Sequence, residues 1–220
     1  MAFFIQKIME FILKEINEYS LSHTEKEPKI LAELNRETWA NVMMPRMLSG
    51  HLQGRILSMF SKMINPKNII EVGTYTGYSA LCMAEGIQND GTLHTIDINE
   101  ETTSIAKRYF QKSKYSKNIK HHIGNALSII PNLKANFQLA FIDADKENYC
   151  AYFDLILDKL DLNGYIIADN VLWSGKVAKE IKDKETQAID NYNKKVLNNT
   201  NFETILIPIR DGLMVSRKIK

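Results

Sequence analysis

Acidic and amide side chains end two apolar runs in the second half of the chain. Asp143 ends one run and has Lys146 three residues later, and Asp169 and Asn170 end another. Two carboxylates and one amide oxygen form a hard, incomplete oxygen site that suits Mg²⁺ above all, and also Mn²⁺ or Ca²⁺. Each acid alone is better explained as a helix cap or a surface acid. The four residues together favour a metal-centred site.

A glycine-containing turn follows an earlier apolar run, in the segment Glu71–Ser79. The dinucleotide fingerprint requires a second glycine where Tyr75 stands, and the lysine of a triphosphate-binding loop is missing, so both nucleotide classes are disfavoured. Asp97 lies 24 residues after Gly73, near the spacing of an acid that hydrogen-bonds a ribose diol. A nucleoside without a diphosphate beside an acidic strand end suits S-adenosylmethionine (SAM), whose sulfonium and amino groups are cationic. A strand-to-helix turn without a ligand is the alternative.

Helix-like runs come first in the chain, and strand-like and helix-like runs alternate from residue 68 onward. Strands are predicted at Asn68–Val72, Thr92–Ile96, Ile119–Ile123, Gln138–Ile142, Tyr165–Ala168, Phe202–Ile209 and Leu213–Ile219. Helices are predicted at 1–15, Pro28–Ala40, Gly50–Met63, Tyr78–Gly86, Glu100–Lys114 and Asn148–Lys159. The turn Arg210-Asp211-Gly212 predicts a closing hairpin.

This order of elements predicts an α/β fold. The expected sheet is doubly wound and Rossmann-like, mostly parallel with one antiparallel strand from the C-terminal hairpin, and it has helices on both faces. In such a sheet the fourth strand lies beside the first and the fifth beside the fourth. Asp143, Asp169 and Asn170 should therefore converge next to the glycine turn.

Length and composition set the remaining bounds. The 220 residues, without a linker or repeat, predict a single domain with a helical part at 1–64 and an α/β core at 65–220. A net charge of +2 gives no strong case for nucleic acid or an anionic membrane. Cys82 and Cys150 cannot build a disulfide framework, and charged residues interrupt the apolar N-terminus, so no signal peptide or membrane span is expected. A reduced, cytoplasmic protein is predicted.

At these residues the chain resembles the cation-dependent class I O-methyltransferases of bacterial type, the family typified by caffeoyl-CoA and catechol O-methyltransferases. The resemblance covers the chain from about Met47 to the C-terminus. It rests on several motifs in one order, namely Met47–Gly54, Glu71–Ser79, Asp97, Gly124–Ala126, Phe141–Tyr149, Asp169–Gly175 and Ile207–Gly212. The first 46 residues match poorly, and Ser174 stands where plant enzymes often carry a longer polar residue, so the acceptor is the least determined feature.

The resemblance implies a set of site residues and an assembly. SAM is expected to be surrounded by Ser49, Glu71, Gly73, Thr74, Ser79, Asp97, Ala126 and Asp145. The cation is expected on Asp143, Asp169 and Asn170. Lys146, as general base, and Asp143 are the expected catalytic residues, and the enzyme is expected to be a homodimer.

The expected reaction is methyl transfer to a hydroxyl of a catechol-like or caffeoyl-type aromatic small molecule. A phenol has a pKa near 10, which a chelated cation lowers, and Lys146 can accept the proton. One alternative is a hydroxylated tRNA base of the 5-hydroxyuridine type, which some bacterial relatives modify. The Lys and Arg residues at 107, 108, 112, 114, 117 and 120 favour it slightly, although a solvated helix face explains them equally well. The other alternative, a non-catalytic SAM-binding module, predicts a broken metal set.

Overall fold

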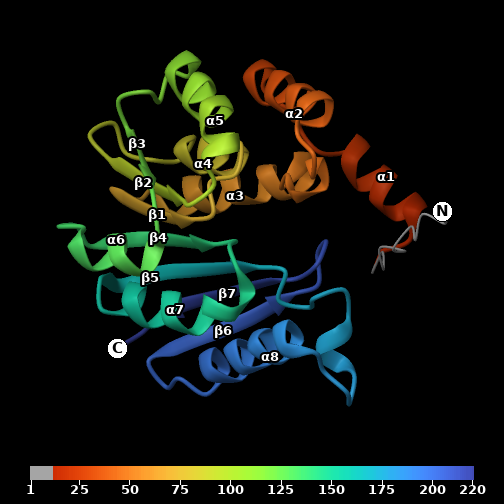
Figure 1. Ribbon diagram of the computed structural model, residues 1–220, viewed down its shortest axis with the longest axis vertical. Coiled ribbons are helices and arrows are strands. Elements are labelled where there is room, and N and C mark those ends of the chain that lie inside the picture. The colour runs from red at the N-terminus through yellow and green to blue at the C-terminus, as the bar shows by residue number, and fades with distance from the viewer. Residues whose placement is uncertain (1–11) are drawn as a thin grey trace.

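A computed structural model describes residues 12–220, and Figure 1 shows a central sheet between two groups of helices. The segments before the sheet are α1 (Lys14–Ser22), α2 (Lys29–Asn41), the 3-10 turn η1 (Pro45–Met47) and α3 (Gly50–Ile64). The bounds of α2 and α3 confirm the predicted second and third helices to within one residue. The helix predicted over residues 1–15 falls mostly on residues 1–11, which lie outside the described part of the chain.

The described residues contain one sheet, with the strand order β3-β2-β1-β4-β5-β7-β6. Its strands are β1 (Asn68–Val72), β2 (Thr92–Asp97), β3 (Ile119–Ile123), β4 (Phe137–Ile142), β5 (Leu160–Asp169), β6 (Phe202–Ile207) and β7 (Leu213–Lys218). Strands β1 to β5 pair in parallel, and β7 runs antiparallel to both of its neighbours. The predicted doubly wound sheet with a single antiparallel strand is therefore confirmed. The strand order reverses between β1 and β4, where ligands bind in such sheets.

Alternate residues of each strand face opposite cores, as the pleat requires. In β4, Leu139 and Phe141 join the core beneath the N-terminal helices, whereas Ala140 and Ile142 join the core on the other side. The remaining helices are α4 (Tyr78–Ala84), α5 (Glu100–Lys112), α6 (Ala126–Ile129), α7 (Tyr149–Leu157) and α8 (Lys184–Leu197). Helices α2 to α5 cover one face and α6 to α8 the other (Figure 1). No helix between residues 12 and 220 is long and apolar enough to cross a membrane.

Helix α8 is absent from the prediction because polar side chains interrupt its buried face. Ile189, Tyr192 and Val196 pack in the core, but Thr186 and Asp190 are buried beside them. Asp190 is held by ion pairs with Lys182 and Lys194, so its burial is compensated by tertiary contacts. A hydrophobic pattern broken by such residues does not reveal the helix.

Gly73 lies where the carboxyl end of β1 closely approaches the backbone that follows β4. Its φ is +106°, and a Cβ atom built there would lie 1.8 Å from the carbonyl oxygen of Asp143. The amide of Asp143 donates to the carbonyl oxygen of Val72 at 2.8 Å, which fixes the two strand ends against each other. Any side chain at position 73 would push the Asp143 loop away from β1.

We expect Gly73→Ala to lower the free energy of unfolding by more than about 1 kcal/mol, because it combines an unfavourable φ with a backbone clash. Urea unfolding followed by circular dichroism measures the loss. Gly50→Ala is the matched control, since Gly50 also has a positive φ (+73°) but no atom within 4 Å of its built Cβ. Equal losses in the two variants would contradict the importance of the close approach.

Candidate active site

The carboxyl ends of β1 to β5 open into a cavity of about 810 Å³, a size usual for small-molecule sites. Seven of the eight residues expected around SAM line it: Ser49, Gly73, Thr74, Ser79, Asp97, Ala126 and Asp145. The expected cation ligands and base line the same cavity: Asp143, Lys146, Asp169 and Asn170. The fold thus brings together both predicted sets of residues in one place.

Glu71 is the expected SAM residue that lies behind the cavity wall. Its carboxylate is fully buried and accepts hydrogen bonds from Ser79 Oγ and Thr95 Oγ1, both at 2.5 Å. Burial raises the pKa of Glu71 to about 8, although these two hydrogen bonds oppose the shift; the charges of Asp143 and Asp97 add to it. Ser79, which lines the cavity, therefore lies between Glu71 and the cavity.

Asp97 holds two loops of the cavity in place. One carboxylate oxygen accepts the backbone N–H of Tyr75 at 2.7 Å, and the other accepts that of Asn99 at 2.8 Å. These contacts join the turn after β1 to the loop after β2. Each oxygen keeps a second lone pair, so Asp97 can also accept a hydrogen bond from a ribose hydroxyl.

Lys146 lies at the centre of the acidic part of the cavity and is buried. Its Nζ donates to Asn170 Oδ1 at 2.8 Å, Asp143 Oδ1 at 3.2 Å and Tyr149 OH at 2.6 Å. The Tyr149 hydroxyl donates in turn to the carbonyl oxygen of Asp169 at 3.1 Å, and burial raises the pKa of this phenol well above 10. Three oxygens from three segments thus surround one ammonium group.

Asp169 is buried beside this cluster and is oriented by Gln53 from helix α3. Gln53 Nε2 donates to Asp169 Oδ2 at 2.6 Å, and the backbone N–H of Asn170 donates to Asp169 Oδ1 at 2.7 Å. Arg210 fixes the Gln53 amide, because its Nη1 donates to Gln53 Oε1 at 3.2 Å and to the carbonyl oxygen of Ser49. Burial and the charge of Asp143 raise the pKa of Asp169, whereas Arg210, Gln53 and Lys146 oppose that rise.

The cavity wall contains several strained backbone positions. Five of the non-glycine residues with positive φ line it: Tyr75, Asn170, Trp173, Ser174 and Arg210. Such conformations persist only where the surrounding contacts impose them, and they cluster at functional sites. Trp173 both packs against the core and borders the cavity, with its ring centre 5.6 Å from Lys146 Nζ.

Gln53, Arg210 and Tyr149 are site residues to which the sequence assigned no role. Gln53 gave a readable signal, since it is a polar residue on the buried face of α3, which also contains Gly54 and Leu57. Arg210 gave no signal in the sequence, because its hydrogen-bond partners lie more than 150 positions away in the chain.

We expect the stability of the ligand-free protein to fall with rising pH through the titration of Glu71. Above pH 4.5 the unfolded chain has released this proton, but the folded chain keeps it until about pH 8. The contribution of Glu71 to the free energy of unfolding should therefore decrease across this window by up to about 1.4 kcal/mol per pH unit. Glu71→Gln should flatten the dependence between pH 6 and 8 in urea titrations. An exposed control, Glu180→Gln, should keep the wild-type slope; equal slopes in all three proteins would contradict the assignment.

Comparisons with known proteins agree with this geometry. The model of the O-methyltransferase family matches residues 20–219. Caffeoyl-CoA O-methyltransferase of Petroselinum crispum is 31% identical to this chain over 207 residues, which cover 88% of this chain and 86% of the relative. Caffeoyl-CoA O-methyltransferase 5 of Nicotiana tabacum is 33% identical, with the same coverage of both chains.

Solved structures show the same architecture. The SAH-bound methyltransferase PaMTH1 of Podospora anserina superimposes with a TM-score of 0.86 at 26% identity, covering 94% of both chains. The O-methyltransferase of Bacillus cereus in complex with SAH gives 0.85 at 25% identity, covering 93% of this chain and 97% of the other. Together with the cavity at the carboxyl edge of the sheet, these matches identify the chain as a SAM-dependent O-methyltransferase of the caffeoyl-CoA O-methyltransferase family.

Proposed function

We propose that this enzyme transfers the methyl group of SAM to a hydroxyl of a catechol-like or caffeoyl-type aromatic small molecule, with a divalent cation held by Asp143, Asp169 and Asn170. One observation carries the proposal. The Lys146 ammonium, itself a cation, contacts Asp143 and Asn170 at once, and Asp169 is buried beside them. The oxygen atoms that surround the Lys146 ammonium are therefore also suited to binding a metal cation.

The chemistry of the donor set fits a cation of the Mg²⁺ type. Among residues 12–220 no three His, Cys, Asp or Glu side chains form a metal cluster, and the proposed set consists of two carboxylates and an amide, all oxygen donors. Hard cations prefer such oxygens and keep positions open for water or substrate. The raised pKa of Asp169, which burial and Asp143 cause, supports the proposal because a cation would offset this repulsion.

The side chains of the cavity account for the other parts of the reaction. A bound divalent cation supplies Lewis-acid polarisation of the acceptor hydroxyl, which makes it more acidic. An acceptor hydroxyl bound beside this set of oxygens would lie near Lys146, and the Lys146 amine, once it has released its own extra proton, accepts the hydroxyl proton. The acceptor oxygen then forms a bond to the methyl carbon as the carbon–sulfur bond breaks. Holding both reactants in one cavity supplies the orientation that the attack needs.

The position of the basic residues supports a small-molecule acceptor over a tRNA. Lys112 ends helix α5, and Lys114 and Lys117 follow it. Because α5 leads from the carboxyl edge of β2 back to the start of β3, its 13 residues place this group about 20 Å from the cavity. Arg108 is paired with Glu37. These residues do not form a basic track leading to Lys146.

Three further expectations stay predictions: one domain over residues 1–220, a homodimer and a cytoplasmic location. The family resemblance supports the homodimer, and the exposed apolar side chains Met43, Met44 and Met47 near the cavity offer surface for contacts.

Removal of the cation should abolish activity. We expect EDTA to stop methyl transfer to a catechol and Mg²⁺ or Mn²⁺ to restore it. Asp169→Ala should stay inactive at ordinary metal concentrations, because one of three protein ligands is lost, but calorimetry should still detect SAM binding. Asp90→Ala, which removes an exposed carboxylate, is the control and should behave as wild type. Full activity in EDTA would contradict the proposed cation and indicate a metal-independent methyltransferase.

Replacement of the proposed base should affect turnover and not cofactor binding. We expect Lys146→Met to lower kcat by roughly 10²–10⁴-fold, the usual contribution of general acid–base catalysis, with little change in the Kd for SAM. Lys184→Met is the matched control, since Lys184 is an exposed lysine paired with Glu147 at 2.7 Å. A Lys146→Met enzyme with normal kcat would show that Lys146 is not the base.

A further inference from the structure

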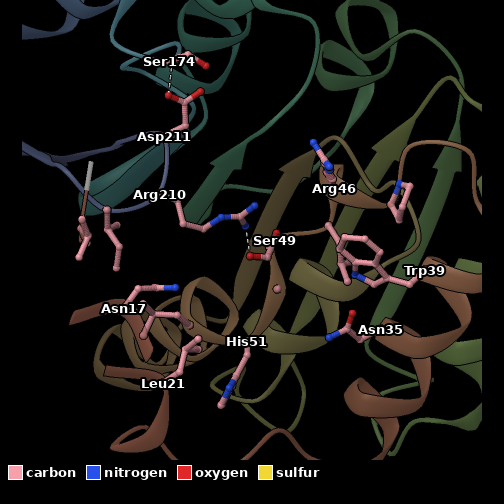
Figure 2. A pocket seen from close by; sticks show the side chains of 16 residues that line it. Asn17, Leu21, Asn35, Trp39, Arg46, Ser49, His51, Ser174, Arg210 and Asp211 are labelled. Atoms are coloured by element: carbon pink, nitrogen blue, oxygen red, sulfur yellow. Dashed lines mark hydrogen bonds between the residues drawn. The ribbon is translucent and has the colours of Figure 1, made fainter. Parts of the chain in front are cut away.

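A second cavity, of about 660 Å³, adjoins the first. The two share the wall formed by Arg46, Leu48, Ser49, Ser174 and Arg210. The second cavity lies between the N-terminal helices and the loop from β6 to β7 (Figure 2). Ser174 follows Trp173, whose ring lies near Lys146. The part of an acceptor that extends beyond its reacting hydroxyl would therefore enter this second cavity.

Two arginines on the shared wall give this junction a positive charge. Arg46 has no hydrogen-bond or ion-pair partner among residues 12–220. Arg210 uses Nη1 for Ser49 and Gln53, which leaves its Nε and Nη2 donors for a ligand. Figure 2 shows Arg210 directed at Ser49 from one side, with Arg46 on the other side of Ser49. No carboxylate of the described residues lies within ion-pair distance of either guanidinium.

The acid that lines the second cavity is already engaged. Asp211 Oδ1 accepts the backbone N–H of Ser174 at 2.6 Å, and burial raises the pKa of its carboxyl. His51 contacts the carbonyl oxygen of Glu25 at 2.6 Å. The charge of Arg210 also offsets Asp169 in the first cavity. Arg46, which has no such partner in the described part of the chain, leaves the lining suited to a single anionic group.

The rest of the lining is suited to an apolar body. It includes Ile12, Leu21, Trp39, Leu48, Leu52 and Ile209. A ligand with an aromatic or aliphatic frame could pack against these side chains and present one anionic group to the arginines. A guanidinium can bind a carboxylate or a phosphate with two parallel hydrogen bonds, and the small net charge of this lining favours the singly charged carboxylate.

We propose that the acceptor is a dihydroxyaromatic carboxylic acid in its free, monoanionic form, whose carboxylate is bound by Arg46 and Arg210. This inference rests on the proposed function and narrows its substrate class. A neutral ester of the same acid loses the charge, and a coenzyme A thioester replaces it with a much larger polyanion. Both should be poorer substrates than the free acid.

The test compares acceptors that share the reacting catechol. We expect the kcat/KM of wild-type enzyme with Mg²⁺ to be roughly tenfold to a hundredfold higher for 3,4-dihydroxycinnamate than for its methyl ester, the range of a charge-assisted contact. The coenzyme A thioester should also fall below the free acid. Arg46→Met should lower the acid-to-ester ratio several-fold, since Arg210 alone then holds the carboxylate, and an unchanged circular dichroism spectrum shows that the variant is folded. Arg36→Met, which removes an exposed arginine outside the cavity, should keep the wild-type ratio.

Three results would overturn the inference while the proposed function stands. They are equal kcat/KM for acid and ester, a coenzyme A thioester preferred to the acid, and an Arg46→Met variant with a raised KM for SAM but an unchanged acid-to-ester ratio. The last would assign the arginine to the carboxylate of SAM. If no catechol is methylated at all, the proposed function has failed and the inference fails with it.

Discussion

Three carboxylates, on Glu71, Asp143 and Asp169, belong to three neighbouring strands and lie at the same edge of the sheet. Their repulsion is the constraint to which the surrounding residues respond. After burial, the charge of Asp143 raises the pKa of both other acids. Hydrogen bonds and positive charges reduce this repulsion at each acid. Ser79 and Thr95 donate hydrogen bonds to Glu71. Gln53 and the charge of Arg210 act on Asp169, and Lys146 pairs with Asp143.

The same constraint explains why cationic ligands suit this edge. At neutral pH the buried Glu71 carboxyl keeps its proton, since its pKa is about 8. A positive group bound nearby lowers that pKa, so binding is accompanied by proton release. Asp143 raises the pKa of Glu71 on one side and of Asp169 on the other, so it connects the two parts of the cavity electrostatically. Coupling of this kind needs no movement of the backbone.

The sequence was sufficient to predict those parts of the site whose positions follow from the order of the strands. Asp143, Asp169 and Asn170 end apolar runs, and the order of a doubly wound sheet places those ends together, so their convergence could be predicted. The contacts of Gln53 and Arg210 could not, because they join α3 to the loop between β6 and β7, across more than 150 residues. Helix α8 was missed for a related reason: Asp190 is buried on its packed face, and its partner Lys182 precedes the helix.

The two cavities differ in what builds them. The first cavity is built on strand ends, which backbone hydrogen bonds and the close contact at Gly73 hold in place. These strand ends hold the proposed reactive groups. The second cavity is built from the N-terminal helices, η1 and the strained loops that contain Ser174 and Arg210. Loops and peripheral helices can change without disturbing the sheet. The acceptor can therefore change without a change in the catalytic edge of the sheet, and the roles proposed for Arg46 and Arg210 belong to this more variable part of the molecule.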